Sequence, residues 1–299
     1  MASRCFRFSG HQTFAFRYGW PEKGYDFVIH GNHFSDPDAM ITLGVGKNMV
    51  ESIKYWCEML GIISEYGKVT AFAQKLLDRE NGWDPYLEDN ASLWLLHWRF
   101  CTQTQWMSAA TFLFGETFKN AISYKEFNNL LEKKLSSIGD SQKKRTPSSN
   151  IITRDIDCCI RMYTPPRNDV KNPILELSYG CPFQELGLCS VSYQENVIRF
   201  AIGPKQDLPP EIIGYAIWDY LSRDRRQASS LGELTFSPYS PGSVFVLDEN
   251  SLVDALESLQ QHSRWHNYFS LTASEGIETV HCTLRDGNEL LNSYYSTTE

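Results

Sequence analysis

The segment Leu43-Gly44-Val45-Gly46-Lys47-Asn48-Met49-Val50 constrains the fold of this chain more than any other. Gly44 can adopt a positive φ, which allows two helices to meet at a steep angle. Gly46, Lys47 and Asn48 then begin the second of these helices, where partial positive charge and free backbone N–H groups favour a phosphate. The segment is therefore typical of the turn and first residues of a DNA-recognition helix.

The flanking residues predict the remaining parts of a winged helix-turn-helix over about residues 18–75. A first helix is expected at 18–30, and a short second helix follows Asp36, a favourable N-cap. The third helix, 47–60, carries apolar residues at alternating spacings of three and four, which predicts one buried stripe. The residues on either side of Tyr66-Gly67 predict a small β-hairpin, which is the wing.

The rest of the chain is predicted to be mainly α-helical with small β-hairpins, and mixed α+β toward its C-terminal end. Residues 1–139 form the predicted winged-helix and helical DNA-binding domain, and residues 140–149 a basic linker. Residues 150–299 form the mixed α+β domain, for which a second winged helix is an alternative. The further helices are expected at 91–120 (one buried helix or a packed pair), 124–138, 150–163, 209–221 and 250–261, and strands at 189–193, 197–202 and 279–284.

The net charge of −8 weighs against a nucleic-acid partner only until it is counted by segment. Residues 1–150 contain 17 Lys/Arg and 16 Asp/Glu, a balance of +1, whereas residues 151–299 contain 11 and 20, a balance of −9. The half with the predicted recognition helix is therefore nearly neutral, and local charge governs DNA affinity. The run Lys143-Lys144-Arg145 is a candidate contact to phosphates, with a solvated loop as the alternative.

Composition and missing motifs narrow the class of protein. No apolar run reaches the roughly 18 residues of a membrane-spanning helix, and the first residues lack the apolar core of a signal peptide. The eight cysteines include no Cys-x-x-Cys pair, which indicates reduced thiols in a cytoplasmic protein without a membrane partner. A Walker-type phosphate loop, His-Glu-x-x-His and Gly-x-Ser-x-Gly are absent, so an ATPase, a zinc protease and an α/β-hydrolase are not expected.

Two clusters carry groups suited to phosphodiester chemistry. The first contains His11, an acid or base, and Arg17, a phosphate ligand; a capped turn packed on the first helix is the alternative. The second contains Asp84, Glu88 and Asp89, whose carboxylates suit Mg²⁺. Because Asp-Pro starts turns and an acidic residue can cap the helix that follows, a structural role is the alternative here too.

The predicted recognition helix offers several groups to DNA. Lys47 and Lys54 are assigned to phosphates, Asn48 and Ser52 to base edges, and Gly46 to the helix start. A winged helix that binds protein instead of DNA is the alternative.

Three motifs together resemble a bacterial family, the SspB-like family of DNA phosphorothioation loci, formerly filed as a domain of unknown function. The motifs are Phe8-Ser9-Gly10-His11-Gln12-Thr13-Phe14-x-x-Arg17-x-Gly19-Trp20, the Leu43–Val50 segment, and Gly82-Trp83-Asp84-Pro85-Tyr86-Leu87-Glu88-Asp89 followed by Leu93-Trp94-Leu95-Leu96-His97-Trp98. They cover about residues 6–100, and Pro173-Ile174-Leu175-Glu176-Leu177 adds weaker support.

The resemblance implies a role in placing sulfur in the DNA backbone, a modification linked to antiphage defence. The family's loci also encode a cysteine desulfurase and a reductase-like sulfur-transfer protein, which are the implied partners. The member in the single-strand version of the system is described as DNA-nicking. The expected function is therefore a DNA-binding component that nicks DNA to allow sulfur incorporation, and the rivals are a non-enzymatic adaptor or regulator and a protein-binding scaffold.

The resemblance places no catalytic set, so the candidate catalytic residues rest on side-chain chemistry alone. They are His11 as acid or base, Arg17 on the phosphate, and Asp84 and Glu88 on Mg²⁺ or Mn²⁺.

Overall fold

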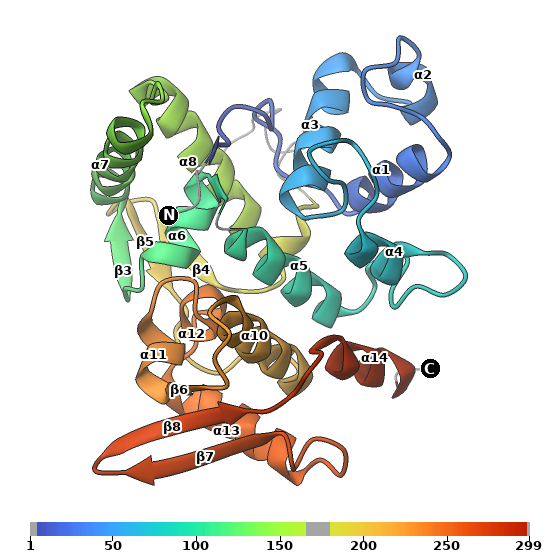
Figure 1. The fold of residues 1–299 in the computed structure, drawn as a ribbon. Coiled ribbons are helices and arrows are strands. Elements are labelled where there is room, and N and C mark those ends of the chain that lie inside the picture. Colours follow the sequence, from blue (N-terminus) through green and yellow to red (C-terminus); the bar gives the residue numbers. More distant parts are fainter. Residues whose placement is uncertain (1–4, 104, 166–179, 298–299) are drawn as a thin grey trace.

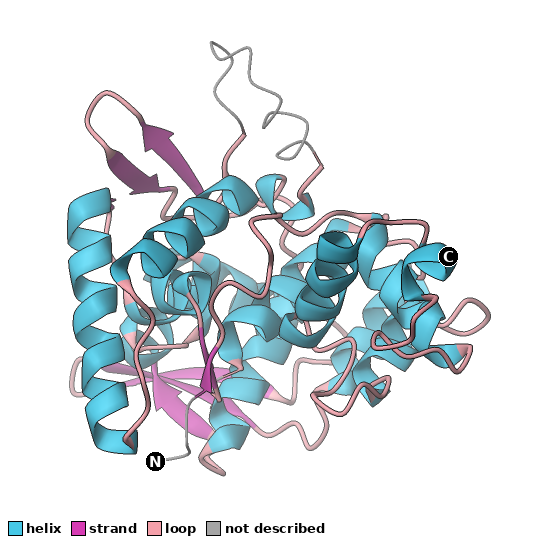
Figure 2. Ribbon diagram, turned by 90° about the horizontal axis from the view of Figure 1, so that it is seen from above, coloured by secondary structure: helices cyan, strands magenta, loops and turns pink. Residues whose placement is uncertain are grey.

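The computed structural model describes residues 5–103, 105–165 and 180–297. About half of these residues are helical, and their strands form three small sheets (Figure 1 and Figure 2). The Pro173–Leu177 motif lies outside the described residues.

The helices are α1 (Gly19–Ile29), α2 (Ala39–Leu43), α3 (Lys47–Met59), α4 (Ala71–Leu77), α5 (Asn90–Thr102), α6 (Ala109–Glu116), α7 (Tyr124–Gln142), α8 (Ser149–Tyr163), the 3-10 helix η1 (Pro182–Gln184), α10 (Pro210–Arg223), α11 (Leu231–Phe236), α12 (Pro241–Phe245), α13 (Glu249–Gln261) and α14 (Asn288–Thr297). The strands are β1 (Cys5–Phe6), β2 (Trp106–Met107), β3 (Ala121–Ser123), β4 (Cys189–Ser192), β5 (Val197–Phe200), β6 (Ala228–Ser230), β7 (Phe269–Ser274) and β8 (Ile277–Cys282).

The high helix content and the small antiparallel sheets are consistent with the mixed α+β character expected from the sequence. Two sheets are antiparallel, with strand orders β3-β5-β4 and β6-β8-β7, and β1 pairs in parallel with β2. Strand β3 precedes the basic run and β5 follows it, so the two sides of residues 140–149 share a sheet.

One continuous apolar core extends from Ala15 to Tyr295. His97 is fully buried, with Nδ1 2.9 Å from the Tyr163 hydroxyl and Nε2 2.8 Å from the Val244 carbonyl. Burial disfavours the charged imidazole and lowers the pKa of His97 to about 4. The neutral ring therefore donates to the carbonyl and accepts from the hydroxyl, and it joins α5, α8 and α12.

Helices α1, α2 and α3 pack around a small core of their own. Gly44 ends α2 with a φ of 64°, the left-handed conformation that the sequence predicts for this turn. Helix α2 begins at Ala39, later than predicted, because the Asp36 carboxylate accepts the His33 amide at 2.7 Å and does not cap the helix. The buried members of this core are Phe27, Ala39, Leu43 and Val50.

The predicted wing is reduced to one antiparallel bridge between Ile63 and Val69. Pairing ends early because Thr70 already caps α4, accepting the Ala73 amide at 3.1 Å. Tyr66, at the turn between the paired residues, is exposed.

The longer predicted helices are confirmed, with boundaries shifted by a few residues. The helical region predicted at 91–120 is a packed pair, α5 and α6, and a capping box at Ser108 and Thr111 starts α6. Helix α7 extends into the predicted basic linker and ends at Gln142, followed by the C-cap Lys143, whose φ is 52°. None of the helices in the described part of the chain combines the length and apolar character required to span a membrane.

Candidate DNA-contacting helix and acidic cleft

The N-terminal end of α3 lies at the upper edge of the molecule in Figure 1. Gly46 is its N-cap in an extended conformation, and no side chain in the described ranges caps the helix. The Met49 amide donates to the Gly46 carbonyl at 2.9 Å, so among the described residues only the Lys47 and Asn48 amides of the first turn are left without an acceptor. Lys47 and Asn48 are exposed beside them. This end of α3 is thus free to approach an anion.

The next turn of α3 matches the sequence prediction only in part. The Lys54 side chain is 49% exposed, and its Nζ lies 3.9 Å from the Glu58 carboxylate. Ser52 is fully buried, and its hydroxyl donates to the His11 carbonyl at 2.9 Å. Because the loop before α1 covers this side of α3, Ser52 is out of reach of a base edge.

The basic run lies in the loop between α7 and α8, which is also at the upper end of Figure 1. Lys143 and Arg145 are exposed. The Lys144 amide donates to the Gly139 carbonyl at 2.9 Å and fixes the start of the loop.

The loop that carries His11 has an unusual backbone conformation. Ser9, Gln12 and Thr13 have φ values of 64°, 49° and 68°, a region in which side chains crowd the backbone. Gly10 is required for a different reason, since a Cβ at this position would lie 2.3 Å from Cδ2 of Tyr55.

His11 is buried and faces Asp155 of α8. Its Nε2 lies 3.0 Å from Asp155 Oδ1, but the N–H direction misses the oxygen, so the contact is a close charge pair without an aligned hydrogen bond. Asp155 also accepts the Ser9 amide, and the Thr13 amide points at Nδ1 of His11 at 3.0 Å. Burial favours the neutral imidazole, but Asp155 and Cys158 together outweigh burial and raise the pKa of His11 to about 9. The pair fastens the N-terminal loop to α8.

Arg17 follows this loop and is half-buried against aromatic rings. Its guanidinium carbon lies 5.9 Å from the ring centroid of Phe14 and 5.5 Å from that of Trp20. Its Nε is buried without a hydrogen-bond partner, and no acidic side chain in the described ranges forms an ion pair with it. An unpaired guanidinium against aromatic faces is available to an anion.

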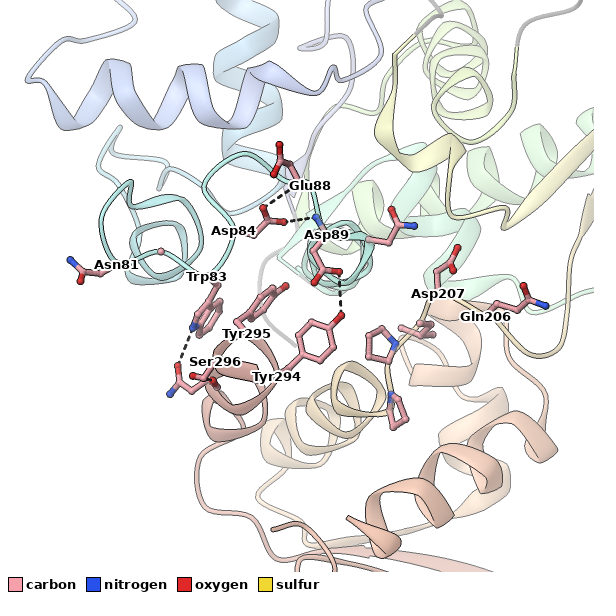
Figure 3. Close-up of a pocket in the computed structure, with 16 residues that line it drawn as sticks. Asn81, Trp83, Asp84, Glu88, Asp89, Gln206, Asp207, Tyr294, Tyr295 and Ser296 are labelled. Atoms are coloured by element: carbon pink, nitrogen blue, oxygen red, sulfur yellow. Dashed lines mark hydrogen bonds between the residues drawn. The ribbon is translucent and has the colours of Figure 1, made fainter. Parts of the chain in front are cut away.

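A cleft of about 1130 Å³ lies between the Gly82–Asn90 loop, the residues before α10, and helix α14 (Figure 3). Four carboxylates line it, and no described Lys or Arg does. A cleft with this lining favours a cation over a bare phosphate. The acidic lining residues are Asp84, Glu88, Asp89 and Asp207.

Asp84 organises the loop at the edge of this cleft. Its Oδ1 accepts the Glu88 amide at 2.9 Å and its Oδ2 the Asp89 amide at 3.0 Å (Figure 3). Asp89 in turn is the N-cap of α5 and accepts the Ala91 amide at 2.8 Å, so the capping alternative is confirmed for this residue. Glu88 is exposed.

The opposite wall of the cleft is α14, which sequence reasoning did not assign to the site. Trp83 stacks on Tyr295 with a centroid distance of 5.5 Å and donates to the Asn292 amide oxygen at 3.0 Å. The Tyr294 hydroxyl donates to Asp89 at 3.2 Å (Figure 3). The neighbouring tyrosines were the only signal in the sequence that this helix packs against a polar loop.

The structure does not bring the predicted catalytic residues together. Asp84 and Glu88 lie at the acidic cleft, whereas His11 lines a small buried cavity with Asp155, and Arg17 precedes α1. In the described ranges, no group of three or more His, Cys, Asp or Glu side chains is arranged to hold a metal ion. Asp155, the partner of His11, carried no signal in the sequence.

Comparisons with known proteins agree with the resemblance seen in the motifs. The model of a family described as a protein of unknown function, DUF4007, matches residues 8–295. An SspB crystal structure is 29% identical, with a TM-score of 0.82, and the match covers 97% of this chain and 88% of that chain. A magnesium ion-bound SspB crystal structure is also 29% identical with the same coverage and a TM-score of 0.81. No curated protein matches this chain.

Proposed function

The chain belongs to the DUF4007 family, and from this premise we propose that it is the DNA-binding component of a bacterial DNA phosphorothioation system, which nicks DNA so that sulfur can enter the backbone. The observation that carries the proposal is the similarity to the SspB structures over nearly the whole chain. The exposed N-terminal end of α3 supports the choice of DNA as the partner.

In this proposal, α1 to α3 act as a winged helix-turn-helix, and the Ile63–Val69 bridge is the base of a short wing. The exposed start of α3, from Gly46 to Asn48, approaches the backbone and base edges. Lys54 and the Lys143–Arg145 loop contact phosphates farther along the duplex. Residues 1–139 thus carry most of the DNA contact, and residues 150–299 complete the acidic cleft.

We place Mg²⁺ at the acidic cleft, held by Asp84 and Glu88, because hard carboxylate oxygens are the ligands that this ion prefers. Each Asp84 oxygen accepts one amide and keeps a second lone pair for the ion. When bound, Mg²⁺ supplies the positive charge that a phosphodiester requires in a cleft lined by carboxylates. The similarity to a magnesium ion-bound structure supports this metal, and no comparison supports Mn²⁺.

The other two predicted catalytic residues take different roles in the proposal. Arg17 holds a phosphate, since no acidic side chain in the described part of the chain pairs with its guanidinium. His11 positions the loop that leads to Arg17 and transfers no proton, because it is buried against Asp155.

A non-enzymatic DNA-binding adaptor is the second candidate. The burial of His11 and the two backbone bonds to Asp84 favour it, because both arrangements stabilise the fold without any chemistry.

DNA binding is tested by fluorescence anisotropy with a labelled duplex between about 50 and about 200 mM salt. Lys47→Ala is expected to weaken binding for every sequence and to reduce the salt slope by about 1. The control is Lys125→Ala, an exposed lysine near the start of α7, roughly 26 Å along that helix from the basic loop. Equal losses in both variants would contradict the placement of DNA on α3.

Nicking is tested with supercoiled plasmid in the presence and absence of Mg²⁺. Relaxation that requires Mg²⁺ and is lost in Glu88→Gln supports the enzyme. Glu88 is exposed and its side chain makes no contact with another described residue, so the substitution is expected to leave the fold intact. A gel shift without relaxation favours the adaptor. A chain that neither shifts nor relaxes DNA contradicts both candidates.

The proposed protein partners are the cysteine desulfurase and the reductase-like sulfur-transfer protein of the same system. A cytoplasmic location is part of this proposal, and the eight free cysteines support a reducing compartment. Co-purification of the chain with either partner is the direct test.

A further inference from the structure

A second cavity, of about 290 Å³, lies between the C-terminal end of α10 and the loop from β8 to α14. Among the residues that the structure describes, three arginines line it, Arg225, Arg226 and Arg285, and no acidic side chain does. Trp218 forms part of the wall, and Gly287 packs so closely on the indole that a Cβ there would lie 2.2 Å from Cε3. The cavity is thus positively charged, although residues 151–299, to which its lining belongs, have a net charge of −9.

The three arginines differ in how their charge is satisfied. Arg226 is anchored, with one guanidinium nitrogen 2.7 Å from the Glu233 carboxylate, while its buried Nε has no hydrogen-bond partner. Arg225 and Arg285 are exposed, and neither forms an ion pair or a side-chain hydrogen bond with any residue in the described ranges. Two free guanidinium groups beside an anchored one form the fork-like donor set that binds phosphate oxygens.

We propose that this cavity binds a backbone phosphate of DNA, as a contact separate from α3; the inference rests on the proposed DNA-binding function. Phosphate fits because the donors are arginines, the cavity is small, and the described lining residues include no carboxylate that would repel an anion.

The position of the cavity relative to the acidic cleft supports a DNA strand as the source of the phosphate. Helices α10 and α14 are in contact, and α10 contributes residues to both cavities. Pro210 at the start of α10 lines the acidic cleft, and Leu221 near its end lines the arginine cavity. Eleven residues of helix span roughly 16 Å, which corresponds to about five phosphates of a B-form strand. A strand held by the arginines would therefore reach the acidic cleft within about half a helical turn of DNA.

The test measures binding of labelled DNA to the full chain, using anisotropy at several salt concentrations. The variant Arg225→Ala/Arg285→Ala removes two exposed, unpaired charges, so thermal melting is expected to match that of the wild type. The control, Arg264→Ala, removes an exposed charge of the same half that lies outside the cavity. We expect the double variant to bind about tenfold more weakly, with the salt slope reduced by about 2, and the control to change little. Arg225→Lys/Arg285→Lys keeps the charge and is expected to restore only part of the affinity, because lysine lacks the planar fork.

Each outcome decides between the proposals. If the wild type binds DNA and the double variant binds equally well with an unchanged slope, the arginine cavity is not a DNA contact and the α3 proposal stands. If the wild type binds no DNA, the proposed function and this inference both fail. If inorganic phosphate or a mononucleotide saturates the cavity while DNA affinity is unaffected by the double variant, the site takes a free anion and the inference is overturned.

Discussion

The charge pair between His11 and Asp155 makes a quantitative prediction about stability and pH. The pKa of His11 is raised from 6.5 to about 9 in the folded chain, so the folded state retains a proton that the unfolded state has lost between these values. This contribution is fully present below about pH 6.5 and disappears as the pH rises through about 9. A difference of this size corresponds to about 3 kcal/mol of stability.

Asp155→Asn isolates this contribution. The amide keeps the size of the side chain and an acceptor for the Ser9 amide, but it removes the charge that stabilises the imidazolium. Wild type and variant are compared by urea unfolding, followed by tryptophan fluorescence, from about pH 6 to about pH 9.5. The wild type is expected to be more stable at the acidic end. The difference in free energy of unfolding between the two chains should narrow by up to about 3 kcal/mol across the range, because Cys158, which also raises the pKa of His11, remains in the variant.

Subtracting the free energy of unfolding of the variant from that of the wild type cancels the contributions of other groups that titrate between these pH values. Lys205, for example, has its pKa lowered by burial to about 8, and it acts equally in both proteins. A difference in free energy of unfolding that stays constant from about pH 6 to about pH 9.5 would refute the reasoning. It would mean that His11 is neutral throughout, with the Thr13 amide held on an unprotonated Nδ1.

Three further substitutions test local packing by urea unfolding or fluorescence. Gly10→Ala places a Cβ 2.3 Å from the Tyr55 ring and should cost about 2 kcal/mol; an unchanged midpoint would mean that the loop can shift freely. Asp89→Ala removes the cap of α5 and should cost about 1 kcal/mol, whereas Asp89→Asn, which keeps an acceptor oxygen, should recover most of it. Gly287→Ala drives a Cβ into Trp218 and should shift the tryptophan emission as well as destabilise the chain, and an unaltered spectrum would contradict the close approach.

Local features of the fold could be predicted because they depend on neighbouring residues. Gly44 adopts the predicted left-handed conformation, and the α3 stripe of Val50, Ile53 and Trp56 is buried as its spacing indicates. The exposure of Lys47 follows from the same periodicity.

The errors arise where a distant segment covers a surface that looks polar in the sequence. Ser52 lies off the apolar stripe, yet the loop before α1 packs on it and takes its hydroxyl. The partner of His11 is 144 residues away in α8, and no periodicity connects the two. The acidic cleft also depends on distant segments. The sequence predicted only the Asp84–Asp89 cluster, whereas the cleft also contains Asp207 and residues of α14. Chemistry could be assigned to single residues, but the assembly of a site depends on tertiary contacts.

The wall that α14 contributes to the acidic cleft has a consequence for synthesis. Trp83 and its partner Asn292 are separated by 209 residues, so the cleft cannot close until almost the whole sequence has been translated. The small core of α1 to α3 requires only residues within the first 50, and it can form much earlier on the ribosome. A stalled or truncated chain would therefore present the start of α3 without the cleft, and an intact Trp83–Tyr295 stack would report that synthesis and folding were complete.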